Sequence, residues 1–257
     1  MKIRKLAAAV FGAVSLMAAG AANADLFPDF TVTPGVYAPG KAAFVADKIT
    51  GNYAERITFN NNGTFDVSLK WNAGQFVQND GVDTIGSGIT GLNANYGIYA
   101  LFLGKGTFTA TTFTLGSGAF SFVLDGLNNT TFMSAPSQSP SLIWGTGSTG
   151  DDVVLATGTA ISGAGNLTCN VGNNCGSFGQ LTTFAVTNPA GMGFFTAPNP
   201  FYDLSLQSGQ FNGFTPSGTL TLNGSMDVIF GKVPEPGTIA LVGLALLGLG
   251  AARRRAA

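Results

Sequence analysis

Short runs of alternating apolar and polar residues, separated by clusters of glycine and asparagine, fill the middle of this chain. The clearest run covers residues 107–125, where Phe120, Phe122 and Leu124 alternate with Ser121 and Val123. A period of two is typical of a half-buried strand, and no segment of the middle region shows a sustained helical period of 3.6 residues. The sequence therefore predicts an all-β domain.

The other predicted strands follow the same pattern. They cover residues 56–60, 64–71, 96–103, 153–159, 181–186, 202–206 and 218–230. Gly116, Ser117 and Gly118 are predicted to form a hairpin turn inside the long run. Strands at this spacing indicate a single antiparallel β-sandwich or barrel-like domain. No fixed-period repeat occurs, which argues against a solenoid.

The chain has 21 phenylalanines but only 5 tyrosines, so most aromatic rings are expected to fill the core. Trp71 and Trp144 stand beside turn residues, where an exposed ring can stack on a sugar. The alternative is that each tryptophan caps the core at the end of a strand.

The N-terminus has the layout of a secretory signal peptide, residues 1–24. Basic residues precede an apolar stretch, and Ala22 and Ala24 are the small residues that signal peptidase requires at positions −3 and −1. Asp25 is therefore expected to begin the mature protein, and the all-β domain is expected to cover residues 25–232.

The C-terminal segment, residues 233–257, has three parts in a fixed order. Pro234, Glu235 and Pro236 stay extended because proline lacks a backbone donor and fixes φ. An uncharged apolar stretch, 238–252, follows, with a predicted helix length of about 22 Å. That is short for a hydrocarbon core of about 30 Å, so we expect a temporary membrane anchor. Three arginines at 253–255 are expected to remain cytoplasmic.

This tripartite segment resembles the PEP-CTERM sorting signal of Gram-negative bacteria. The resemblance implies recognition by an exosortase, a membrane-embedded cysteine transpeptidase, and cleavage near Pro234, Glu235 and Pro236. It assigns Arg253, Arg254 and Arg255 to the same sorting signal. An ordinary C-terminal anchor is the alternative.

Without the two terminal segments the chain is acidic. Residues 25–233 hold six basic and twelve acidic residues, a net charge of −6. Binding to nucleic acid requires a basic face, so a nucleic-acid partner is not expected.

Cys169 and Cys175 are the two cysteines of the chain. In an exported protein such a pair is expected to form a disulfide that closes a loop rich in glycine and asparagine. A two-thiolate metal site is the alternative, although the chain has no histidine to complete it.

The lack of histidine removes the Ser-His-Asp and Cys-His nucleophile systems, so an enzyme is not expected, and neither is a cofactor. Carboxylate chemistry is left as an option, because glycosidases need only two acids. Glu55 is expected to pair with Arg56 or Lys48 instead.

Two acidic turns offer oxygen ligands suitable for Ca²⁺, one at Asp151 and Asp152 and one at Asp80 and Asp83. The alternative is that these aspartates bind nearby backbone amides, as turn residues commonly do. No metal site is predicted.

Two segments of the domain are similar to the flocculation-associated PEP-CTERM proteins of floc-forming betaproteobacteria. They are Ala46 to Glu55, with the pattern ADK-x-x-G-x-Y-x-E, and Tyr96 to Phe102, with the pattern YG-x-YA-x-F. The resemblance implies a role in holding cells within an exopolysaccharide matrix. The loop between Cys169 and Cys175 departs from that family.

The sequence thus predicts an exported surface or matrix protein that promotes flocculation or biofilm aggregation. Its expected partners are signal peptidase, an exosortase and exopolysaccharide, with a transient inner-membrane anchor. The alternatives are a carbohydrate-binding module of the matrix, an ice- or surface-adsorbing protein with threonine rows, and a carboxylate-dependent hydrolase.

Overall fold

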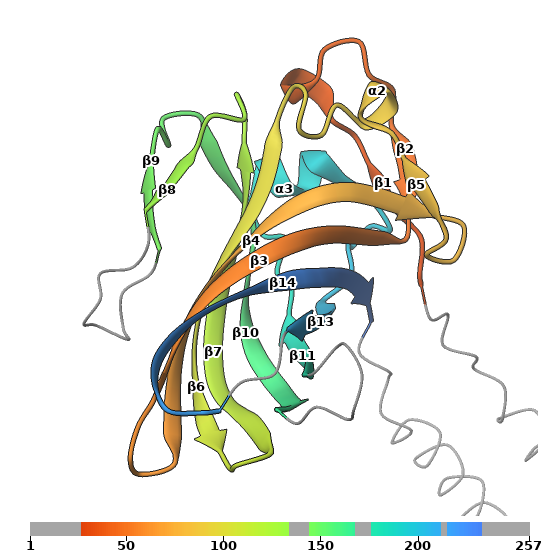
Figure 1. Cartoon of the computed structure of the whole chain (residues 1–257). Helices are drawn as coiled ribbons and strands as arrows, with labels where there is room; N and C mark the ends of the chain where they lie inside the picture. Colours follow the sequence, from red (N-terminus) through yellow and green to blue (C-terminus); the bar gives the residue numbers. More distant parts are fainter. Residues whose placement is uncertain (1–26, 134–143, 168–175, 212–214, 233–257) are drawn as a thin grey trace, which may run out of the picture.

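The computed structural model describes residues 27–133, 144–167, 176–211 and 215–232. Eight long antiparallel strands form one sheet that closes on itself (Figure 1). In chain order they are β3 (Lys48–Phe59), β4 (Thr64–Gln78), β6 (Gly97–Phe108), β7 (Thr112–Asp125), β10 (Asp152–Asn166), β11 (Ser177–Thr183), β13 (Leu204–Phe211) and β14 (Gly218–Gly231). Each of the eight predicted runs overlaps one or two of these strands, although the bounds of several differ.

The barrel closes because β3 pairs on both of its sides. One edge of β3 pairs with β14, from Val228 opposite Ile49 to Gly218 opposite Phe59. The other edge pairs with β4. The prediction of an all-β antiparallel domain is confirmed, and of the two architectures predicted, the closed barrel is the one observed.

A small second layer covers one end of the barrel (Figure 1). A three-stranded sheet joins β1 (Phe30–Val32), β2 (Phe44–Ala46) and β12 (Phe195–Ala197), and the short helix α3 (Pro189–Phe194) precedes β12. Strand β5 (Asp83–Ile85) extends the sheet beside the end of β4, next to the single-turn helix α2 (Ser87–Thr90). The 3₁₀ turn η1 (Gly35–Tyr37) lies between β1 and β2.

Phenylalanine rings fill the covered end of the barrel. The Phe30 and Phe184 rings both contact Phe230, with centroid distances of 5.0 and 4.6 Å, and Phe195 contacts Phe201 at 4.7 Å. Edge-on and tilted packing of this kind stabilises aromatic clusters beyond the burial of area alone. The expectation that most phenylalanines belong to the core agrees with this cluster.

Farther along the barrel, phenylalanine rings lie on interior glycines of neighbouring strands. A Cβ atom added at Gly158 would lie 2.3 Å from Phe120 Cε1, and one at Gly106 would lie 2.6 Å from Phe65 Cε1. A glycine leaves a gap in a sheet that an adjacent aromatic ring can cover. Phenylalanine and glycine, both abundant in this chain, therefore pack against each other on neighbouring strands.

The predicted turn at Gly116, Ser117 and Gly118 is wrong. These residues lie inside β7, where the register shifts opposite Lys105 and Gly106. Gly118 is needed because a Cβ there would lie 2.4 Å from Phe102 Cζ. The turn between β6 and β7 instead lies at 109–111, where the Thr109 hydroxyl accepts hydrogen bonds from the amides of Thr111 and Thr112.

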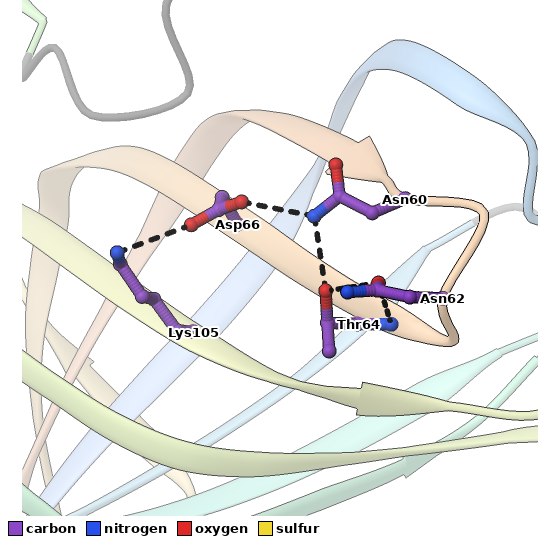
Figure 2. A network of polar contacts seen from close by, with 5 residues as sticks. All are labelled: Asn60, Asn62, Thr64, Asp66 and Lys105. Atoms are coloured by element: carbon purple, nitrogen blue, oxygen red, sulfur yellow. Dashed lines mark hydrogen bonds and ion pairs between the residues drawn. The ribbon is translucent and has the colours of Figure 1, made fainter.

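Side chains also organise the turn between β3 and β4 (Figure 2). The side-chain oxygen Oδ1 of Asn62 accepts from the Thr64 amide at 3.2 Å and from the Thr64 hydroxyl at 2.7 Å. Asn60 Nδ2 donates to Thr64 Oγ1 and Asp66 Oδ2, both at 3.1 Å. Asp66 also pairs with Lys105 of β6 at 3.6 Å. Local bonds from asparagine are a common means of fixing a turn.

Among the described residues, no helix has the length and apolar character needed to cross a membrane. The signal peptide and the helix predicted at 238–252 lie outside the described residues.

Candidate functional site

The interior of the barrel contains a carboxyl group. Glu55 lies on β3 with the same alternation as Tyr53 and Ile57, which are buried. Successive side chains on a strand point to opposite faces, so Glu55 faces the interior while Arg56 faces outward. The predicted pairing of Glu55 with Arg56 or Lys48 is therefore wrong, and the Lys48 ammonium pairs with Asp227 at 3.2 Å instead.

Glu55 borders a cavity of about 50 Å³ whose walls are almost entirely apolar. Ile57, Phe65, Phe113 and Phe211 are among the lining residues. Burial raises the pKa of the Glu55 carboxyl to about 7, and no basic group offsets this effect. The barrel wall surrounds the Glu55 side chain, which is nevertheless only half-buried because it borders the cavity.

A second cavity, of about 40 Å³, adjoins the first. The two cavities share Leu69, Phe102, Phe178 and Gln180 in their walls. Gln207 lies in the wall of the second cavity and opposite Gln180 in the register of β13 and β11. An eight-stranded barrel has an interior that side chains fill or that holds one small ligand.

The outer surface of the barrel carries a row of uncharged polar residues. The register places six exposed residues side by side on adjacent strands: Asn52, Ser225, Gln210, Ser177, Asn166 and Thr112. At a strand spacing of about 4.8 Å the row follows an arc of about 24 Å. A shallow groove of about 300 Å³ lies at the middle of the row, where Ser177, Gln210 and Ser225 line it. Ser208 and Asp227 also line this groove.

Both tryptophans are buried, as the alternative of core capping predicts, so the hypothesis that they stack on sugars is wrong. Trp71 is 0% exposed inside the barrel, and its Nε1 donates to the Met226 carbonyl oxygen at 3.0 Å. Trp144 is 8% exposed and donates to the Ser68 carbonyl oxygen at 3.2 Å. Trp144 directly precedes β9 (Gly145–Gly147), which pairs with β8 (Thr131–Met133). Lys70 Nζ lies 5.4 Å from the centroid of the Trp144 ring.

Asp125, Asp151 and Asp152 form the one group of three carboxylates in the described part of the chain whose ligand atoms lie within 4.8 Å of one another. Such oxygens are suitable for a hard cation. Each of the three carboxylates already accepts a hydrogen bond from the protein. Asp125 accepts from the amides of Asn129 and Thr130. Asp151 accepts from the Leu127 amide at 2.6 Å. Asp152 accepts from the Tyr99 hydroxyl at 2.6 Å.

These bonds change the acidity of the cluster. Burial acts to raise the pKa of Asp125, but hydrogen bonds from the Thr130 and Asn129 amides outweigh it and lower the pKa. Burial and the bond to Asp152 raise the pKa of the Tyr99 hydroxyl. The cluster therefore fastens the turn after β7 to the start of β10. Asp151 binds a backbone amide, as the alternative predicts, although that of the distant Leu127, whereas Asp152 accepts from the side-chain hydroxyls of Tyr99 and Thr130.

The turn at residues 79–83 is organised in the same manner. Asn79 Nδ2 donates to Asp83 Oδ2 at 3.0 Å, and the Gly81 amide donates to Asp47 Oδ2 at 2.9 Å. Asp47 is completely buried, and its pKa is raised mainly by burial. Asp47 belongs to the first of the two segments that prompted the flocculation resemblance, and in this structure it supports the turn.

The remaining predicted site residues lie outside the described residues. They are Ala22, Ala24 and Asp25 of the signal cleavage site, Cys169 and Cys175 of the predicted disulfide, and Pro234, Glu235, Pro236, Arg253, Arg254 and Arg255 of the sorting segment.

Comparison with known families identifies the class of this protein as one that carries an export and sorting segment. Residues 232–255 match the model of the PEP-CTERM protein-sorting motif. The chain is a PEP-CTERM domain-containing protein. This motif implies an exported surface protein that is processed by an exosortase. No curated protein and no solved structure matches the chain.

Proposed function

We propose that the protein is a non-enzymatic component of the extracellular matrix of a Gram-negative bacterium, where it binds exopolysaccharide and promotes flocculation or biofilm aggregation. The sorting motif at residues 232–255 is the observation that carries this proposal, since it directs the β-barrel to the cell surface. The similarity of residues 46–55 and 96–102 to flocculation-associated proteins supports the same role.

The outer polar row supports association with a neutral polysaccharide. Hydroxyl and amide groups of Ser177, Gln210 and Ser225 are suited to hydrogen bonds with sugar hydroxyls. Asp227 in the groove pairs with Lys48, so the two charges offset each other. A face without a basic excess does not attract an anionic polymer. We therefore propose that the polysaccharide contacts this row, on the strands from β3 to β7 in the order of the sheet.

Affinity electrophoresis in gels that contain the host's own exopolysaccharide tests this contact. The double variant Gln210→Ala, Ser225→Ala should be retarded less than the wild-type protein. The double variant Gln75→Ala, Ser87→Ala is the matched control, since it makes the same changes at exposed residues of a different groove, beside α2. Equal retardation of both variants and the wild type would remove the proposed contact.

Adsorption to a lattice such as ice has less support. Such binding needs a flat, regular array, whereas Thr107 and Thr219 lie on separate strands of a curved barrel, β6 and β14. Thr219 and Thr58 also bond to each other at 3.0 Å. A non-enzymatic role would be contradicted if purified protein released new reducing ends from the matrix polysaccharide.

A further inference from the structure

The half-buried Glu55 carboxyl faces the cavity rather than a protein partner. In the described part of the chain its side chain makes no hydrogen bond and no ion pair. Tyr53, two residues earlier on the same face, donates its hydroxyl to the Gln210 carbonyl oxygen at 3.3 Å instead. The Glu55 carboxyl therefore has free acceptor capacity inside the barrel.

The basic side chains near this part of the barrel are engaged elsewhere. Lys48 pairs with Asp227 and Lys105 with Asp66, while Lys70 Nζ lies 4.4 Å from the centroid of the Phe132 ring. The three lysines and Arg56 occupy strand positions that alternate with the inward-facing positions. Their side chains therefore point away from the barrel interior. A cation that reaches Glu55 must therefore come from outside these residues.

A second free acceptor lies in the adjoining cavity. Gln207 Nε2 donates to Thr182 Oγ1 at 3.1 Å and to Ser205 Oγ, but Gln207 Oε1 is buried without a partner. The interior thus offers two acceptors, Glu55 and Gln207 Oε1, separated by apolar walls that include Phe102 and Phe178. A ligand that matches this arrangement has a hydrogen-bond donor joined to a slender apolar body.

We propose that the barrel interior binds a short primary alkylamine, with its ammonium group on the Glu55 carboxylate and its alkyl chain between Phe102 and Phe178. The size of the cavities sets the size of the ligand. Each cavity exceeds the 10–15 Å³ or so that one water requires but is well below the roughly 150 Å³ of a cavity that holds benzene. An unbranched chain of n-butylamine size extends from one cavity into the other. This site is independent of the outer polysaccharide contact.

The chain offers a direct test by carboxyl ¹³C NMR. Glu55 and Glu235 are the two glutamates of the full-length chain, so ¹³C-glutamate labelling gives two side-chain carboxyl resonances, and the Glu55→Gln variant assigns them. Added n-butylamine should shift the Glu55 resonance saturably and lower the apparent pKa of this group by about one unit, a tenfold preference of the amine for the ionised form. n-Butanol and butyrate should not do so.

Two variants make the result specific. Glu55→Gln should bind n-butylamine at least tenfold more weakly, as followed through methyl resonances of Leu69 and Leu115, whereas Glu235→Gln should bind like the wild type. The proposal is overturned if the Glu55 resonance does not saturate, which is the result expected for cavities that hold water alone. It is also overturned if n-butanol binds as well as n-butylamine, or if Glu55→Gln retains full affinity.

Discussion

Phe120 of β7 lies across the backbone of Gly158, its direct cross-strand neighbour on β10. A Cβ atom at Gly158 would lie 2.3 Å from Phe120 Cε1 and 1.9 Å from the Thr183 carbonyl oxygen. The ring occupies the space that a side chain would take, and the backbone behind it cannot move away without breaking the pairing of β10. This glycine is therefore required by packing and not by an unusual φ.

Gly158→Ala should consequently lower the free energy of unfolding by about 1–3 kcal/mol, the usual cost of overpacking a core. Gly179→Ala is the matched control, because Gly179 is also inside a strand but has no atom within 4 Å of its added Cβ. Urea unfolding followed by circular dichroism measures both. Equal stability of the two variants would contradict the packing of rings on glycines.

Glu55 should make the stability of the barrel depend on pH. Its pKa is raised from 4.5 to about 7 in the folded state, so the folded protein binds more protons than the unfolded chain between these values. The stabilisation is complete below pH 4.5 and is lost as the pH rises through 7, by up to about 3 kcal/mol. Unfolding measured at pH 5 and pH 8 should show the loss in the wild type, whereas Glu55→Gln should show much less of it.

Asp125 should matter more for stability than an exposed turn aspartate. Asp125→Ala leaves the amides of Asn129 and Thr130 without their acceptor, at a cost of about 1–3 kcal/mol. Because the pKa of Asp125 is lowered below 3.8 on folding, its contribution is present above that value and disappears as the pH falls through the folded pKa. Asp83→Ala, at an exposed position, should change thermal unfolding little; an equal loss in both variants would argue against the anchoring role.

The buried tryptophans should not take part in sugar binding. Trp71→Phe and Trp144→Phe each keep an aromatic ring but lose a hydrogen bond to a strand carbonyl. We expect both variants to be less stable in thermal unfolding, yet to be retarded by exopolysaccharide as much as the wild type. Loss of retardation in a folded variant would restore the stacking hypothesis for that residue.

Alternation along the strands was a reliable guide to this fold, because one face of each strand meets the core. It also contained information about Glu55, since Ile49, Tyr53, Ile57 and Phe59 share its odd spacing and are buried. Arg56 was expected to neutralise Glu55 because the two are adjacent in sequence. Adjacent residues on a strand face opposite sides of the sheet, so Arg56 cannot do this. The position of a glutamate inside the barrel was thus predictable.

Other features depend on contacts between distant residues and leave no local pattern. Closure requires β3 to pair with β14 as well as with its sequence neighbour β4, and β3 and β14 are far apart in the sequence. The glycines at 116 and 118 resemble a turn, but Gly118 instead leaves space inside β7 for the Phe102 ring of β6. Trp144 is adjacent to a glycine, as an exposed ring often is, but the register of β8 and β9 places it against β4.

The sorting segment at residues 232–255 is expected to deliver this barrel to the cell surface through exosortase processing. Mass spectrometry of both termini of the protein recovered from the surface of native cells tests this route. We expect an N-terminus at Asp25 and a C-terminus near Pro234, Glu235 and Pro236, with the apolar segment and the three arginines removed. Surface protein that still carries Arg253, Arg254 and Arg255 would contradict it.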